Sequence, residues 1–169
     1  MRKFAKTTGA QLVALYLLNH EENALRLEAA YGDTEGSLKV GSSYSLQPQA
    51  RPGFHSGHTA RAVSEQSTQV VTDVFADVEF LPWRLAARND GWVVSVPLTS
   101  RGRTLGALDL YIVQDKPVQG ERLEMLEAMA SLVAPAIENR RGHLALISAD
   151  DADADDDPDR LPERVSRAA

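Results

Sequence analysis

The chain has 169 residues, 43% of them hydrophobic, which is enough for one domain with a single core. It contains no cysteine, which excludes disulfides, thiolate metal sites and thiol nucleophiles. The formal net charge of -6 is concentrated in residues 150–169, and the near-neutral remainder lacks the basic surface that nucleic acids or anionic lipids require.

The first predicted elements are two strands joined by a turn. Residues 12–19 form a short apolar run whose length favours a buried strand over a helix. Residues 24–31 alternate between apolar and polar side chains, which predicts a second strand with one less-buried face. A third short strand is expected over residues 43–46.

The middle of the chain mixes short elements with loops. Residues 47–57 contain two prolines and two glycines, which is typical of a loop. Helical spacing predicts a short helix over 59–66, and β-branched residues predict a strand over 69–72. Residues 73–91 are expected to form a loop, one short helix and a turn.

The clearest hairpin comes next. Residues 92–99 and 104–113 are predicted strands on either side of a Gly-containing turn. Gly106 inside the second strand indicates that another backbone or a helix approaches closely there. From 121 to 147 the apolar residues recur with a helical period, which predicts a long final helix.

This order of elements predicts an α/β (α+β) fold with an antiparallel sheet, because hairpins lie at both ends and βαβ units are missing. We expect one domain over residues 1–147, with a leading helix that is shortened because only residues 1–8 are available for it. Residues 148–169 are expected to form an acidic disordered tail or linker, since they cannot bury enough apolar surface. No run of eighteen apolar residues exists, so no membrane span is predicted.

Four segments, spread over roughly residues 9–141, resemble the GAF family of sensory domains. They are ALYLLNHEENALRLEAAYG (14–32), GHTARAVSEQSTQVVTDV (57–74), VPLTSRGRTLGALDLY (96–111) and AIENRR (136–141). The resemblance implies a six-stranded antiparallel sheet with helices on both faces. It places a pocket under residues 54–91 and the terminal helices on the other face.

Members of this family sense small molecules such as cyclic nucleotides, haem or bilins, and many only dimerise. Without cysteine the chain can neither attach a bilin nor reduce methionine sulfoxide. It also lacks the Asn-Lys…Phe…Asp-Glu pattern of the members that bind cyclic nucleotides. The cofactor or ligand is therefore left unknown.

Aromatic residues gather in and beside the variable segment, and we expect them at a ligand pocket. They are Phe54, Phe75, Phe80, Trp83 and Trp92. The alternative is that they plug the pocket and complete the core.

Asp109 is an ionisable residue in an otherwise apolar strand. Alternation places it on the same side as Ala107 and Tyr111, and the resemblance implies that this side faces the pocket. Asp109 and Ser95 are therefore the expected polar contacts of a ligand. Because burying a lone carboxylate is costly, the alternative is a structural hydrogen bond to a loop amide or an arginine partner.

His58 is a further candidate ligand-binding residue, since His55 and His58 have a spacing that could serve a metal or a haem. The alternative is that both are solvated or locally hydrogen-bonded in a Pro- and Gly-rich loop, since further metal ligands are not clustered nearby. No metal site is predicted.

The sequence therefore predicts a non-catalytic sensory or regulatory domain of a cytoplasmic signal-transduction protein. No nucleophile elbow, phosphate-binding loop or dinucleotide motif exists, so no catalytic residues are proposed. A heptad-like stripe in the final helix predicts a homodimer: Leu123, Leu126, Ala130, Val133, Ile137, Leu144 and Ile147. The alternatives are a purely structural dimerisation domain with a plugged pocket and an enzyme resembling methionine sulfoxide reductases, which the missing cysteines disfavour. Neither nucleic acid nor membrane is expected as a partner.

Overall fold

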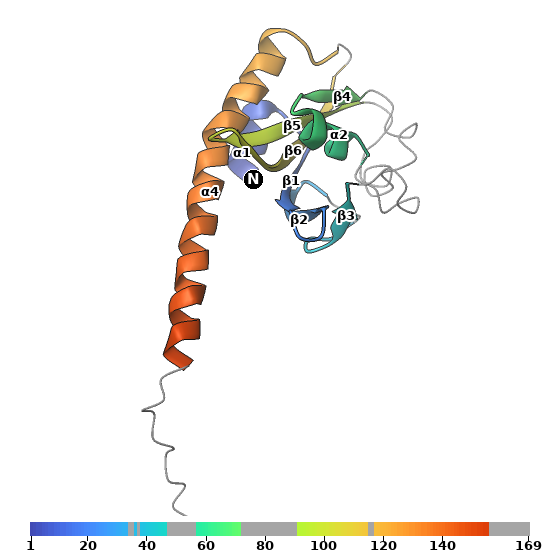
Figure 1. The fold of residues 1–169 in the computed structure, drawn as a ribbon. Coiled ribbons are helices and arrows are strands. Elements are labelled where there is room, and N and C mark those ends of the chain that lie inside the picture. Colours follow the sequence, from blue (N-terminus) through green and yellow to red (C-terminus); the bar gives the residue numbers. More distant parts are fainter. Residues whose placement is uncertain (34–35, 37, 47–56, 72–90, 115–116, 156–169) are drawn as a thin grey trace, which may run out of the picture. The chain divides into compact units, whose positions relative to one another are not determined.

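The computed structural model describes residues 1–33, 36, 38–46, 57–71, 91–114 and 117–155, the last fifteen of these by their backbone alone (Figure 1). The chain divides into two units, Met1–Pro135 and Ala136–Ala169. All the strands described below belong to the first unit. The aromatic residues Phe54, Phe75, Phe80 and Trp83 lie outside the described residues.

The first unit is built on one six-stranded sheet in which every neighbouring pair is antiparallel. The order across the sheet is β3-β2-β1-β6-β5-β4. The strands are β1 (Leu12–Asn19), β2 (Ala24–Tyr31), β3 (Ser43–Ser45), β4 (Gln69–Val71), β5 (Gly91–Ser100) and β6 (Arg103–Val113). The predicted six-stranded antiparallel sheet is confirmed.

Three helices accompany the sheet in the described ranges. They are α1 (Arg2–Thr8), α2 (Gly57–Glu65) and α4 (Glu121–Asp155). α1 ends at Gly9, whose left-handed φ of 69° suits the glycine that commonly closes a helix. None of the helices in these ranges is long and apolar enough to cross a membrane.

α4 continues past Ile147, where the sequence placed the boundary between domain and tail. The helix runs to Asp155, because the Ala- and Asp-containing stretch after Ser148 holds no glycine or proline to end it. Pro135 stands inside the helix, at the boundary between the two units, and cannot donate the usual backbone hydrogen bond.

The two faces of the sheet are covered by different helices. Figure 1 shows α2 on one side of β5 and β6, with α1 and the first part of α4 on the other. The α2 face holds the main apolar core, which includes Tyr16, Tyr44, Val63 and Ala107. The predicted helices on both faces are confirmed.

The core of the α2 face contains an edge-to-face aromatic pair. The rings of Tyr16 and Tyr44 lie 6.1 Å apart at an interplanar angle of 75°. Burial raises the pKa of the Tyr44 phenol above its ordinary value, and a hydrogen bond with Ser42 offsets part of that rise.

Gly106 is required by close packing between the two central strands. A Cβ atom at this position would lie 2.0 Å from the carbonyl oxygen of Tyr16 on β1. No side chain fits there, which confirms the close backbone approach predicted from the glycine inside the strand.

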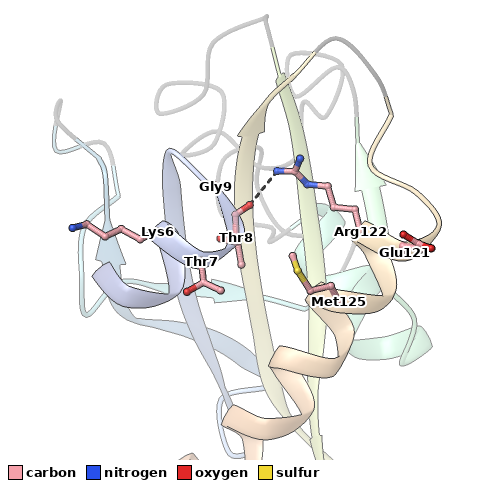
Figure 2. A pocket seen from close by; sticks show the side chains of 7 residues that line it. All are labelled: Lys6, Thr7, Thr8, Gly9, Glu121, Arg122 and Met125. Carbon is pink, nitrogen blue, oxygen red and sulfur yellow. Dashed lines mark hydrogen bonds between the residues drawn. The ribbon is translucent and has the colours of Figure 1, made fainter.

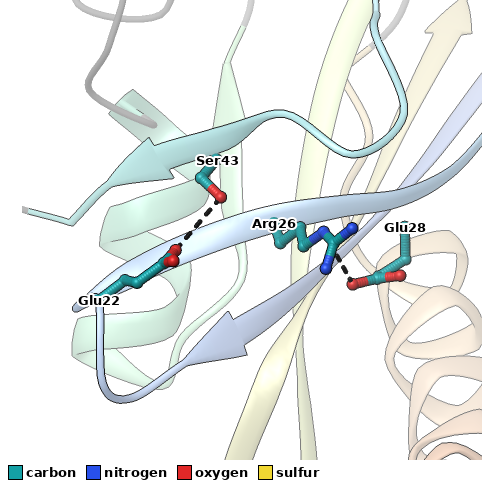
Figure 3. Close-up of polar contacts among 4 residues, drawn as sticks. All are labelled: Glu22, Arg26, Glu28 and Ser43. Atoms are coloured by element: carbon teal, nitrogen blue, oxygen red, sulfur yellow. Dashed lines mark hydrogen bonds and ion pairs between the residues drawn. The ribbon is translucent and has the colours of Figure 1, made fainter.

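The β2–β3 end of the sheet carries polar contacts at the surface (Figure 3). Arg26 Nε lies 3.8 Å from Glu28 Oε1 on the same strand, and Ser43 Oγ donates a hydrogen bond of 3.4 Å to Glu22 Oε2. Because these groups are exposed, the ion pair contributes little to stability.

The predicted heptad-like stripe of α4 is partly used inside the domain. Leu126 and Ala130 are fully buried, whereas Leu132, which is outside the stripe, is 79% exposed. Met125 is 39% exposed and lies seven residues before Leu132, so both occur on one side of the helix. The exposed apolar positions of this part of α4 therefore differ from those of the predicted stripe.

Candidate functional site

Asp109 lies near the middle of β6, one of the two central strands of the sheet. Its direct neighbours are Ala14 on β1 and Ser95 on β5, and Ser95 is in turn opposite Gln69 on β4. Directly opposite residues of antiparallel strands project from the same face. A short polar row therefore crosses one half of the sheet on the face that α2 covers.

α2 supplies the partners of the carboxylate from its first turn. Thr59 Oγ1 donates a hydrogen bond of 2.6 Å to Asp109 Oδ2, and both side chains are fully buried. His58 Nε2 lies 3.7 Å from the same oxygen, and His58 is fully buried as well. The positive end of the helix dipole also favours a carboxylate near this turn.

This arrangement decides between the two sequence hypotheses for Asp109 only in part. The carboxylate has a structural hydrogen bond, and the partner in the described residues is the hydroxyl of Thr59 on a helix. The alternative that placed His58 solvated in a loop is wrong. His58 is the second residue of α2, and the first turn packs that side chain against the sheet.

Ser95 completes the buried polar group. Its side chain is fully buried, and within the described residues its hydroxyl makes no hydrogen bond. An unsatisfied buried hydroxyl costs about 1–3 kcal/mol, so native proteins seldom retain one without a bound partner or a special role.

Trp92 is the predicted site residue that the fold places elsewhere. It lies three positions before Ser95 and directly opposite Ile112, so alternation puts it on the other face of the sheet. Its indole Nε1 donates a hydrogen bond of 3.1 Å to the carbonyl oxygen of Gln114. The structure therefore brings together His58, Ser95 and Asp109, and it leaves Trp92 apart.

Thr59 is the residue that sequence reasoning missed. It forms the shortest described contact of Asp109, yet the two are fifty positions apart in the chain. A threonine in the first turn of a short helix gave no signal that pointed to this partner.

A hollow lies between α1 and the start of α4, and the sequence did not suggest it. It has a volume of about 560 Å³ and is lined by Lys6, Thr7, Thr8, Gly9, Glu121, Arg122 and Met125. Figure 2 shows Arg122 reaching from α4 towards the end of α1, where its Nη2 donates 3.0 Å to the carbonyl oxygen of Thr8. That bond satisfies a terminal carbonyl of α1, which is a structural role.

The chemistry available at the α2 face is hydrogen bonding. In the described part of the chain, no group of three or more His, Cys, Asp or Glu side chains could hold a metal ion. The buried carboxylate, imidazole and hydroxyls instead form a polar spot in an apolar surrounding, which is how small-molecule sites usually fix a ligand.

The GAF domain family model matches residues 1–138 of the sequence. The chain belongs to the GAF domain family. This match confirms the resemblance carried by the four segments. No curated protein matches the chain by sequence.

Solved structures, GAF domains among them, share the fold at low sequence identity. A GAF domain of a phosphoenolpyruvate-protein phosphotransferase from Coxiella burnetii is 14% identical with a TM-score of 0.67, covering 85% of this chain and 81% of that one. The GAF domain of a two-component sensor histidine kinase from Bacillus halodurans is 18% identical with a TM-score of 0.63, covering 85% and 97%. A type II free methionine-R-sulfoxide reductase from Thermoplasma acidophilum is 21% identical with a TM-score of 0.60, covering 82% and 86%.

Proposed function

We propose that this GAF domain is a non-catalytic sensory or regulatory domain of a cytoplasmic signal-transduction protein. In this proposal it binds a small ligand on the α2 face of the sheet, around Asp109 and Ser95, and controls an output domain. GAF domains are commonly sensory or regulatory, and a similar solved structure is the GAF domain of a sensor histidine kinase.

The observation that carries the ligand proposal is the Ser95 hydroxyl. It is fully buried beside Asp109 and lacks a hydrogen bond within the described residues. A ligand with a hydrogen-bonding group would satisfy this hydroxyl, and the neighbouring carboxylate favours a ligand that also donates a hydrogen bond.

Enzymatic activity of the reductase type is not proposed. One similar fold belongs to a methionine sulfoxide reductase, but this chain has no cysteine to supply thiol chemistry.

Native mass spectrometry of the freshly purified full chain tests the ligand. We expect a retained small molecule on the unsubstituted protein and its loss from Ser95→Ala, which removes the hydroxyl without adding volume. Ser64→Ala is the control, because Ser64 is exposed on α2 and bonds only locally. A bare protein mass in all three samples, with no ligand found in the denatured extract, argues for the plugged-pocket alternative.

We also propose that the chain forms a parallel homodimer through α4. The exposed apolar residues Met125 and Leu132 favour this role, because their spacing of seven is what pairing with the same helix of a second copy requires. Assembly and ligand binding are compatible, since α4 and α2 cover different faces of the sheet (Figure 1).

A further inference from the structure

α2 is tied to the rest of the domain at both of its ends. In its first turn Thr59 donates to the buried carboxylate of Asp109 over 2.6 Å. Just beyond its last turn, Thr68 Oγ1 donates a second hydrogen bond of 2.6 Å to Glu127 Oε1 on α4. The second bond is notable because α2 and α4 lie on opposite faces of the sheet (Figure 1).

The connection between α2 and Thr68 is short and internally bonded. Gln66 adopts a left-handed φ of 51°, which reverses the chain directly after the helix. The Glu65 carboxylate accepts hydrogen bonds from Ser67 Oγ (3.4 Å) and Gln69 Nε2 (3.0 Å). These bonds link the last turn of α2, the reversal and the first residue of β4.

Thr68 therefore connects the ligand face to α4 around the β4 edge of the sheet. Both partners of the Thr68–Glu127 bond are half-buried, so water competes for it less than at a fully exposed site. Leu126, next to Glu127, is fully buried. A change at Glu127 thus acts on a part of α4 that is packed against the domain.

We infer that α2 and its bonded connection form a coupling element between the Asp109 site and α4. Occupation of the site alters the Thr59–Asp109 hydrogen bond and shifts α2 together with its connection. This shift in turn alters the hydrogen bond from Thr68 to Glu127. The two states are one with both end bonds formed and one with both released. The inference rests on the proposed function only for the stimulus, a ligand at Asp109.

Hydrogen–deuterium exchange of the full chain, without ligand, tests the coupling. We expect Thr59→Val to speed exchange in the first three turns of α4 by at least about fivefold, in excess of any change in β1 and β2. In a Thr68→Val background the same substitution should add almost nothing to α4, because the connection is already cut. Ser64→Ala, an exposed α2 hydroxyl with only a local bond, should leave α4 unchanged.

Additive effects of the two substitutions on α4, or a rise shared equally with β1 and β2, overturn the coupling. If Thr59→Val does not fold, the reciprocal measurement replaces it: Thr68→Val must then speed exchange in the first turn of α2. Glu127→Gln in the otherwise unsubstituted chain keeps the acceptor oxygen and should retain most of the protection that Thr68→Val loses. If hydrogen–deuterium exchange shows the coupling between α2 and α4 but native mass spectrometry finds no retained ligand, the proposed function fails and this inference stands.

Discussion

Ser95 and Asp109 lie directly opposite each other across β5 and β6, and neither side chain is exposed to solvent. Two polar groups at adjacent positions of a sheet core are costly to bury, so the fold must supply partners for them. α2 does so for Asp109 through Thr59. The stability of the domain is therefore sensitive to the chemistry of this pair.

Replacing Asp109 should distinguish hydrogen bonding from packing. Asp109→Ala removes the acceptor of the buried Thr59 hydroxyl and should lower the free energy of unfolding by about 2–3 kcal/mol. Asp109→Asn keeps an oxygen for Thr59 and should cost less. Urea unfolding of the two variants measures the difference, and equal losses would show that the Thr59 bond contributes nothing.

The close approach at Gly106 gives a second prediction. Gly106→Ala places a methyl group 2.0 Å from the Tyr16 carbonyl oxygen and forces β1 and β6 apart, which should cost about 3 kcal/mol or more. Gly102→Ala is the matched control, since Gly102 has a φ of 74° but nothing within 4 Å, and should cost about 1 kcal/mol. Thermal unfolding followed by circular dichroism compares them. A similar loss in both variants would point to backbone conformation rather than the clash.

Truncating two leucines of α4 to alanine should change the free energy of unfolding by very different amounts. Leu126 is fully buried, and Leu126→Ala should lower the free energy of unfolding by about 2–5 kcal/mol. Leu132 is 79% exposed, and Leu132→Ala should change it by less than about 0.5 kcal/mol. Chemical unfolding at low protein concentration checks both, since dimerisation would otherwise add to the value for Leu132.

The same exposed residues decide the proposed assembly. The unsubstituted chain should sediment as a dimer at tens of micromolar, and Leu132→Glu combined with Met125→Glu should shift it to monomer while leaving the fold intact. Val40→Glu, at an exposed apolar position between β2 and β3, is the control for added charge. A monomeric parent chain under these conditions refutes the homodimer.

Tyr44 predicts an alkaline dependence of stability. Its pKa is raised in the folded chain, chiefly by burial, so above about pH 10 the unfolded chain loses a proton that the folded chain keeps. The contribution of this residue is complete below that pH and falls as pH rises towards the folded pKa. The unfolding free energy of the parent chain should therefore decline more steeply than that of Tyr44→Phe. Parallel pH profiles would show that Tyr44 titrates alike in both states.

The sheet was predictable because its signals are local. The apolar run of β1 and the alternation of β2 predicted the observed bounds of these two strands. Gly106 predicted the close backbone contact that the structure shows. The end of α4 was missed because composition was weighed over the whole acidic segment, although nothing before Pro158 stops a helix.

The site was predictable only where the alternation of side chains along a strand applied. Alternation placed Asp109 on the side of Ala107 and Tyr111, and the family resemblance added Ser95. Alternation along β5 would have separated Trp92 from Ser95. Thr59 could not be found this way, because its contact with Asp109 depends on where α2 lies over the sheet. The periodicity of a sequence predicts helices and strands, but it does not predict where a helix packs on a sheet.

The two outer strands of the sheet, β3 and β4, are only three residues long. Each of these outer strands thus offers only a very short row of outward-facing backbone groups, although the centre of the sheet is long and apolar. Intermolecular strand addition needs a longer template than this. Addition of a strand along β3 or β4 would therefore form few backbone hydrogen bonds, so neither outer strand favours edge-to-edge association of neighbouring copies.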